Sequence, residues 1–374
     1  MNSLKTILNS EQGRSVLLLR VIAVLWFVTK VFSYKTWITD RKYPVVAPAD
    51  FLQKVPSEIH LALFGTAMLM LFAIVISPKK YFLILFLIFE FLSCSLDTVR
   101  WQPWEFMYIC IFALYFLHFR KKKTFFRLLH FFLVSVYIFS GLHKLNRGFL
   151  ENVWLRMVLE NLFNLSQETI VGYKLFFLGL IIPFIEIFAG IVLLFSRRKK
   201  YVSYCLISVH IIVLFFIGPF GLNYNPVIWS WNLAMIFMLI LVYLKPFESF
   251  SLTLLKRNAF WFLLWFVMPV FSFFGMWYQY FSSSLYTGKE KQLYIYVSKE
   301  NEEYRDFSVP DHVQPYHKYY IINLQNWAMK EIKSAPLPED DIYRKISVIL
   351  KDRLGKDCGK IILYDPQTKK QTEL

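Results

Sequence analysis

Residues 120–144 read RKKKTFFRLLHFFLVSVYIFSGLHK, a basic cluster followed by an almost wholly apolar run. The apolar part covers roughly residues 124–143, and a helix of about 20 residues crosses the hydrocarbon core of a bilayer at about 1.5 Å per residue. Lysine and arginine collect at the cytoplasmic ends of membrane helices. The stretch therefore predicts a transmembrane helix whose N-terminal end lies on the cytoplasmic side.

Similar apolar runs recur along the chain, which is 56% hydrophobic and 19% aromatic but only 18% charged. Soluble domains have about a quarter of their residues charged, so this composition excludes an ordinary soluble protein. We predict an all-α polytopic membrane protein with about nine transmembrane helices. The first run carries Arg20 and Lys30 and lacks a small-residue cleavage site, so we interpret it as a retained span. The nine runs lie at roughly 15–35, 60–77, 81–97, 102–119, 124–143, 172–196, 201–218, 227–244 and 258–278.

The net charge of +16 is explained by membrane topology. The first 278 residues hold 27 basic and 12 acidic residues, and the remainder holds 15 and 14. If the N-terminus is cytoplasmic, the inside segments carry 16 basic and two acidic residues. The positive-inside rule then predicts a multi-pass protein of the cell membrane whose C-terminal tail is extracytoplasmic. The basic runs lack interleaved aromatic residues, so we expect membrane lipids and not nucleic acid as partners.

The tail has a different composition from the apolar part. Short β-rich runs occur at 292–297, 319–323 and 360–364, and residues 340–354 have the periodicity of one amphipathic helix. We therefore expect two domains: a helical transmembrane domain over 1–278 and a small extracytoplasmic α+β domain over 279–374. The sequence of the tail does not identify a protein partner.

The sequence lacks the common motifs of soluble enzymes. It contains no GxGxxG, Walker, GxSxG or HExxH pattern. Cys94, Cys110, Cys205 and Cys358 form no CxxC pair and no metal-ligand spacing, so no metal site is predicted. The expected topology allows a bridge between Cys94 and Cys358, and the alternative is that both stay unbridged.

Ionisable residues inside apolar spans are the default candidates for a functional site, because each costs several kcal/mol unless it is paired or functional. The structural alternative is that Glu90 and Glu186 neutralise Arg20 or Lys30 of the first span, and that the histidine of the seventh span is a hydrogen-bonded core residue. The candidates are Arg20, Lys30, Glu90, Glu186 and His210, with Lys144 at the outer end of the fifth span.

Lys144 has polar neighbours at helical spacing. Tyr137, Ser140, Gly141 and Lys144 follow the i, i+3, i+4, i+7 pattern and share one helix face. The glycine would let a flat ligand or a neighbouring helix approach closely. An amine at the membrane edge could serve as a general base. The alternative is a snorkelling lysine beside a small-residue packing face.

These residues carry a resemblance to a known family. The stretch 137–146, YIFSGLHKLN, followed by GFL at 148–150 and by Trp154, resembles a segment of the vitamin K-dependent gamma-carboxylase family and of its bacterial relatives, the horizontally transferred transmembrane (HTTM) domain family. The stretch 183–190, PFIEIFAG, resembles the family's intramembrane acidic segment, and His210 with FIG at 216–218 resembles its His then Ile-Gly segment. The likeness covers most of residues 10–278 in order and span count.

The resemblance implies a chemistry and a cofactor. Lys144 would be the base that deprotonates a reduced quinone of the vitamin K or menaquinol type, which starts its oxygenation to the epoxide. His143 would replace the first basic residue of the family's paired motif, and Glu186 and His210 would be pocket residues.

The departures from the family argue against glutamyl carboxylation. The stretch 100–105, RWQPWE, lacks the histidine that the family uses for that step, and the tail is much shorter than the family's lumenal region. Trp104 in this stretch is expected to stack on a flat ligand or to anchor the helix at the interface.

Two functional hypotheses remain open after the sequence. The first is an intramembrane quinone-linked oxidoreductase or epoxidase that uses Lys144. The second is a non-catalytic multi-pass protein that binds a lipid or a protein partner through its outer tail. A transporter is disfavoured because the spans show no paired, glycine-broken segments in two matching halves.

Overall fold

The computed structural model describes residues 2–246, 252–309 and 318–374. The chain forms two compact units, which we call the helical unit and the mixed unit. The helical unit comprises Met1–Phe32, Gly65–Glu90 and Pro103–Gly288, and the mixed unit comprises Ser33–Phe64, Phe91–Gln102 and Lys289–Leu374. The expected boundary at residue 278 placed residues 33–64 and 91–102 with the transmembrane helices, whereas the structure groups them with the tail.

Helices dominate the first 274 residues. A 14-residue π-helix, Phe149–Leu162, and a five-residue one, Leu263–Val267, interrupt the α-helical pattern. The α-helices are α1 (Asn2–Asn9), α2 (Glu11–Phe32), α3 (Tyr34–Trp37), α4 (Ser57–Ile76), α5 (Lys80–Ser95), α6 (Pro103–Leu117), α7 (Lys122–Lys144), α8 (Gln167–Gly172), α9 (Ile181–Phe195), α10 (Lys199–Ile217), α11 (Pro226–Tyr243), α12 (Leu252–Arg257), α13 (Ala259–Phe262), α14 (Met268–Phe271), α15 (Leu324–Glu331) and α16 (Asp340–Leu354).

Within the described residues, six helices are long and apolar enough to cross a membrane: α2, α4, α7, α10, α11 and the continuous helical run Leu175–Phe195 that ends with α9. The multi-pass helical character is therefore confirmed, but nine spans are not. The expected runs at 81–97 and 102–119 form helices of 16 and 15 residues. The last run is broken into α13, a π-helical turn and α14, with Pro269 in α14, where its missing N–H disrupts regular helix.

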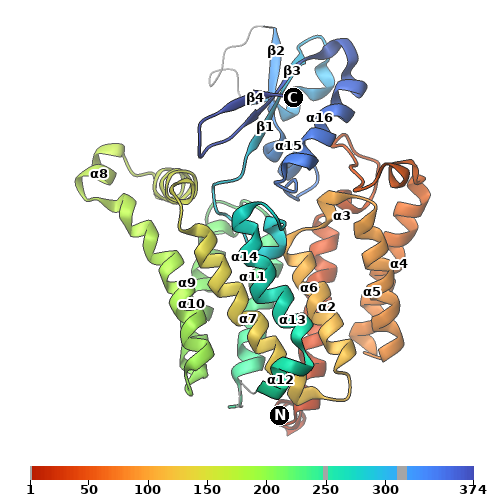
Figure 1. Ribbon diagram of the computed structural model, residues 1–374, viewed down its shortest axis with the longest axis vertical. Coiled ribbons are helices and arrows are strands. Elements are labelled where there is room, and N and C mark those ends of the chain that lie inside the picture. Colours follow the sequence, from red (N-terminus) through yellow and green to blue (C-terminus); the bar gives the residue numbers. More distant parts are fainter. Residues whose placement is uncertain (1, 247–251, 310–317) are drawn as a thin grey trace. The chain divides into compact units, whose positions relative to one another are not determined.

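Helix α7 lies along α9, α2 packs against α11, and α10 contacts both α9 and α11 (Figure 1). Two glycines allow the backbones of α7 and α9 to lie close together. A Cβ atom on Gly141 would lie 2.6 Å from the Pro183 carbonyl oxygen, and one on Gly190 would lie 2.7 Å from Cγ1 of Ile138. The missing side chains let the two backbones approach, as small residues do between membrane helices. The neighbour predicted for Gly141 is therefore a helix.

The core of the helical unit lies between α2, α6, α7 and α11. It is rich in aromatic side chains: Trp26 of α2 meets Phe86 edge to face at 4.7 Å and Phe112 at 5.1 Å between ring centroids. Such edge-to-face pairs add to the stability that burial of the rings provides.

The mixed unit contains a four-stranded antiparallel sheet of order β2-β1-β3-β4. Its central strand places Ile295 opposite Ile322 on one side and Ile361 on the other. Helices α15 and α16 pack against β1 and β3. The three predicted strands and the predicted helix are confirmed, whereas α15 and β4 were not predicted. The strands are β1 (Gln292–Ser298), β2 (Tyr319–Asn323), β3 (Cys358–Tyr364) and β4 (Gln371–Glu373).

Buried polar contacts bind the two earlier segments into the mixed unit. Asp97 accepts a hydrogen bond from Arg41 in an ion pair that is closed to solvent. Arg100 is fully buried and donates to main-chain carbonyl groups of the same unit. Glu331 of α15 accepts the backbone N–H of Tyr43 at 2.8 Å. Cys94 and Cys358 are both free thiols in the structure, so the bridge that the expected topology allowed is not present.

Candidate functional site

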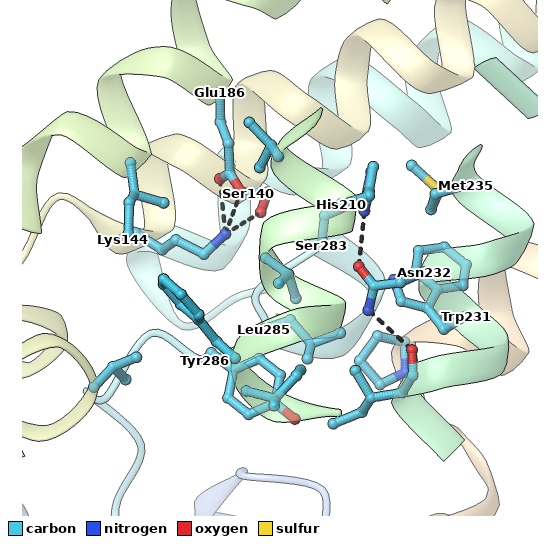
Figure 2. Close-up of a pocket in the computed structure, with 18 of the residues that line it drawn as sticks. Ser140, Lys144, Glu186, His210, Trp231, Asn232, Met235, Ser283, Leu285 and Tyr286 are labelled. Carbon is cyan, nitrogen blue, oxygen red and sulfur yellow. Dashed lines mark hydrogen bonds and ion pairs between the residues drawn. The ribbon is translucent and has the colours of Figure 1, made fainter. Parts of the chain in front are cut away.

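A cavity of about 170 Å³ lies within the helical unit (Figure 2). Its wall is formed by α6, α7, the π-helix, α9, α10, α11 and a segment that follows α14. Most of the lining is apolar, and a few polar side chains converge on it, which is the usual composition of a site for a small lipophilic molecule. The polar or ionisable side chains of helices that line it are Tyr137, Ser140, Lys144, Glu186, His210 and Asn232.

An ion pair between α7 and α9 forms one polar group of the wall. The Lys144 ammonium donates to both carboxylate oxygens of Glu186 at 2.7 Å and to the Ser140 hydroxyl at 2.8 Å. Lys144 is 9% exposed and Glu186 8%. An ammonium has three N–H donors, so these three bonds use all of them. Ser140 lies one helical turn before Lys144, which is why its hydroxyl is within reach of the ammonium.

A second polar group joins α7, α10 and α11. The Tyr137 hydroxyl and Nε2 of His210 are 2.8 Å apart, and Nδ1 of the same histidine lies 2.8 Å from Oδ1 of Asn232. Asn232 in turn donates through Nδ2 to the Ile228 carbonyl at 2.9 Å. Figure 2 shows His210 and Asn232 on a different part of the wall from Lys144 and Glu186.

The π-helix Phe149–Leu162 supplies much of the apolar wall. π-helical turns are rare, and they occur frequently at functional sites. Trp154 is held by a hydrogen bond from its indole nitrogen to the Leu175 carbonyl at 2.9 Å. Gly179 makes room for this ring, because a Cβ there would lie 2.5 Å from the indole. The residues of this helix that line the cavity are Phe149, Val153, Trp154, Met157 and Val158.

Residues 283–288, which we call the strap, complete the wall with Ser283, Leu285 and Tyr286. Ser283 and Tyr286 adopt left-handed backbone angles, with φ of 58° and 54°. Asn152 fixes the end of the strap by donating to the Gly288 carbonyl at 2.9 Å. Left-handed non-glycine residues cost about 1 kcal/mol or more each and collect at ligand clamps. Burial raises the pKa of the Tyr286 phenol well above its usual range, so this hydroxyl stays protonated.

Five of the residues singled out from the sequence meet at this cavity: Tyr137, Ser140, Lys144, Glu186 and His210. The structure places two others elsewhere. Trp104 is 5% exposed in the hydrophobic core of the helical unit. His143 stacks on Phe273 at 4.3 Å and is hydrogen-bonded to the Ser272 hydroxyl at 3.1 Å.

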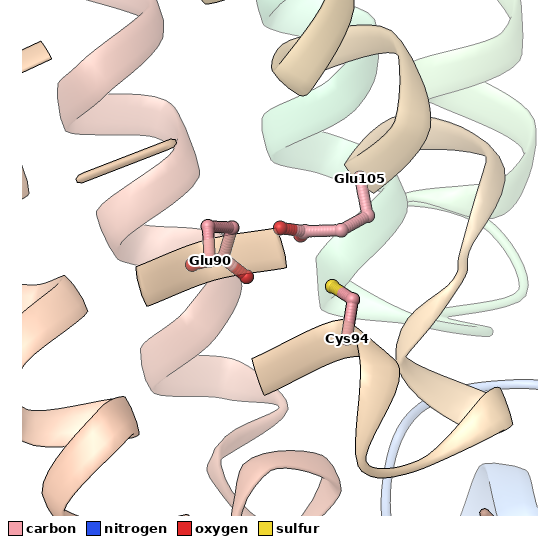
Figure 3. Close-up of side chains that lie close together, drawn as sticks. All are labelled: Glu90, Cys94 and Glu105. Atoms are coloured by element: carbon pink, nitrogen blue, oxygen red, sulfur yellow. The ribbon is translucent and has the colours of Figure 1, made fainter. Parts of the chain in front are cut away.

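Glu90 belongs to a separate buried cluster. Its Oε1 lies 2.7 Å from the Lys30 ammonium, which is also 3.5 Å from Oε1 of Glu105. The Trp26 indole donates to both oxygens of Glu105 at 3.0 and 2.8 Å. Figure 3 shows the Glu105 side chain extending towards Glu90. Glu90 thus takes part in the ion pair that the structural alternative described, whereas Glu186 pairs with neither Arg20 nor Lys30 but with Lys144.

Sequence reasoning missed Asn232, Trp231 and Tyr286 of the cavity wall. Asn232 was detectable in principle, because an amide inside the apolar run 227–244 needs a hydrogen-bonding partner. Tyr286 gave no comparable signal, since it follows the last apolar run in a stretch without periodicity.

Comparison with known proteins finds no family model, no characterised protein and no solved structure that matches this chain. The resemblance to the gamma-carboxylase and HTTM families therefore remains a hypothesis that rests on the motifs around Lys144, Glu186 and His210.

Proposed function

We propose that the helical unit binds a membrane quinol in its cavity and accepts a proton from it at Lys144. The observation that carries the proposal is the convergence of the Lys144 and Glu186 pair with Tyr137 and His210 on one largely apolar cavity. A hydroquinone is a flat apolar ring with two hydroxyl groups, and this wall offers apolar surface with two polar groups.

The ion pair can supply the base without a change of net charge. When a proton passes along the 2.7 Å hydrogen bond from Lys144 to Glu186, it leaves a neutral amine beside a neutral carboxylic acid. The amine then accepts the proton of a quinol hydroxyl, and the resulting ammonium stabilises the quinolate oxygen. In the family that the chain resembles, the deprotonated quinol goes on to react with dioxygen. Glutamyl carboxylation is not part of the proposal.

Purified full-length protein in lipid nanodiscs tests this role. We expect Lys144→Met to lower quinol turnover by about 100-fold or more, the usual contribution of a general base, while quinol binding changes much less. Lys199→Met is the matched control, because this lysine is also 9% exposed but donates to backbone carbonyls away from the cavity. Wild-type turnover in Lys144→Met would exclude the assigned role.

A non-catalytic role is the second candidate, and one observation favours it. All three hydrogens of the Lys144 ammonium are already bonded, as in a purely structural ion pair. In that case the cavity holds a lipid without reacting with it, and the tail binds the partner. The double variant Lys144→Met with Glu186→Leu would then keep partner binding, and deletion after residue 288, which leaves the strap in place, would abolish it.

We further propose that the N-terminus is cytoplasmic and the tail extracytoplasmic, in the cell membrane. The charge distribution supports this orientation, since 16 basic residues fall in the segments expected inside. The orientation requires an odd number of spans. Alkaline phosphatase fused after residue 374 should be active and a fluorescent protein fused there should be dark. The opposite pattern would indicate an even number, as the six long apolar helices alone would give.

A further inference from the structure

The hydrogen bonds between Asn232, His210 and Tyr137 have a fixed direction. Asn232 Nδ2 donates to the Ile228 carbonyl at 2.9 Å, and this contact orients the amide because a carbonyl can only accept. The amide oxygen, Oδ1, therefore faces Nδ1 of His210 at 2.8 Å. An amide oxygen accepts, so Nδ1 carries the proton.

The orientation of the histidine decides that of the tyrosine. Both ring nitrogens of His210 are bonded to uncharged groups, and a neutral imidazole with its proton on Nδ1 has a lone pair on Nε2. The Tyr137 hydroxyl lies 2.8 Å from Nε2 and must donate its hydrogen there. The Tyr137 oxygen can then only accept a hydrogen bond from another group.

We propose that Tyr137 acts as a hydrogen-bond acceptor for the ligand and so makes the cavity select the reduced, hydroxyl-bearing form of a quinone over the oxidised form. This inference rests on the proposed function and specifies its ligand. A quinol hydroxyl donates to the Tyr137 oxygen. A quinone carbonyl at the same place would bring two acceptors together, and a buried polar group without a partner is costly.

The second polar group of the wall reinforces the selection. The hydrogens of the Lys144 ammonium are taken by Glu186 and Ser140, so the Glu186 carboxylate also presents only acceptor oxygens before any proton moves. The hydroxyls of Ser140, Ser283 and Tyr286 keep a hydrogen that they can donate, and they can also accept, so they do not discriminate between the two forms.

The opposite polarity would need an unfavourable contact. For Tyr137 to donate to a ligand, His210 Nε2 would have to carry the proton, and Nδ1 would then need a donor from Asn232. The amide would have to flip, which would place its oxygen against the Ile228 carbonyl. The backbone oxygen of Ile228 is thus the fixed point from which the direction of the whole chain of bonds follows.

The test compares the two oxidation states of one small naphthoquinone. Full-length protein in nanodiscs is titrated under anaerobic conditions with menadiol and with menadione, and each dissociation constant is measured by calorimetry. We expect the wild type to bind menadiol about tenfold more tightly, the effect of one well-matched against one mismatched hydrogen bond. Tyr137→Phe should bring the ratio close to one. Asn232→Leu should do the same, because it frees the imidazole to adopt either tautomer.

Tyr243→Phe is the matched control. Tyr243 is also a buried tyrosine whose hydroxyl lies 2.8 Å from a histidine, Nδ1 of His130, but neither residue lines the cavity. This variant should keep the wild-type ratio. Equal binding of both forms by the wild type, or an unchanged ratio in Tyr137→Phe, would overturn the inference alone. If the wild type bound neither menadiol nor menadione, both this inference and the proposed function would be overturned.

Discussion

Two clusters of charged side chains lie within the apolar segments, and they differ in charge balance. Lys144 and Glu186 are one cation and one anion at the wall of a cavity. Lys30, Glu90 and Glu105 are one cation and two carboxylates in a core that is closed to solvent. A buried ion that loses its partner is costly, so the second set is far less tolerant of change than the first.

Substitution of Lys30 tests this difference. Lys30→Met leaves both carboxylates of the cluster without their cation, and we expect a loss of about 3–5 kcal/mol in stability. Adding Glu90→Gln should recover part of it, because it removes the carboxylate that Lys30 contacts at 2.7 Å. Thermal melts of the detergent-solubilised protein measure both effects, and Lys79→Met, which removes an exposed lysine, is the control. Equal melting temperatures of Lys30→Met and Lys79→Met would contradict the prediction.

At the scale of elements, the site depends on how closely α7 and α9 approach. Gly141 and Gly190 remove side-chain bulk on both helices at their contact. Because Lys144 lies one turn beyond Gly141, and Glu186 lies beside Ile187, a shift of either helix would change the 2.7 Å contact between ammonium and carboxylate. The packing of two helices thus decides whether the ion pair forms.

Alanine at Gly141 should separate the helices. Its Cβ would lie 2.6 Å from a backbone oxygen, so something must move, and we expect a loss of about 1–3 kcal/mol. Gly65→Ala in α4 is the matched control: beyond the backbone of its own helix and its chain neighbours, no atom lies within 4 Å of its Cβ. Removal of a helical glycine should leave stability unchanged or raise it by up to about 1 kcal/mol. Gly141→Ala should lower the melting temperature, and Gly65→Ala should leave it unchanged or raise it. An equal change in both variants would contradict the packing argument.

Gly288 of the strap and Gly275, which precedes the strap, form a second matched pair of glycines. Gly288 and Gly275 have similar positive φ angles of 66° and 69°, so alanine strains the backbone equally at both. Only at Gly288 would the Cβ meet another backbone, the Gly148 carbonyl at 2.3 Å. We expect Gly288→Ala to weaken ligand binding by at least several-fold more than Gly275→Ala, since it displaces Tyr286. Equal effects on the dissociation constant would show that the strap does not shape the cavity.

On the scale of the whole molecule, each of the two units is built from segments that are far apart in the sequence. The mixed unit assembles the tail with residues 33–64 and 91–102. Tyr43 is 1% exposed, with its ring 5.7 Å from that of Trp327, and Glu331 accepts its backbone N–H. The tail therefore shares its core with segments that precede it by more than 180 residues in the sequence.

Residues 289–374 expressed alone should accordingly fail to fold cooperatively. Without the earlier segments, Trp327 and the Glu331 carboxylate lose buried partners, and a unit of under 90 residues has little core to spare. Near-ultraviolet circular dichroism and thermal melts are the measurements. A sigmoidal melt of the isolated tail, matching that of the full-length protein, would contradict the prediction, whereas recovery on fusion to residues 33–64 and 91–102 would support it.

The sequence by itself determined the properties that depend on neighbouring residues. Hydropathy located the apolar helices, short β-rich runs located three strands, and helical spacing placed Tyr137, Ser140 and Lys144 on one face. Nine long spans are not confirmed: two of the expected runs form helices of 16 and 15 residues, and the last run is interrupted by a π-helical turn and by Pro269.

Only the tertiary structure decided which charges meet. The sequence offered Glu90 and Glu186 as alternative partners for the same cations, and packing assigned Glu90 to Lys30 and Glu186 to Lys144. It also brought Asn232 to His210 and joined residues 33–64 to the tail. Local periodicity fixes the helix face on which a side chain lies. An ion pair between residues 42 or 60 positions apart forms only when the packing of two helices brings both side chains to the same level and turns them towards each other.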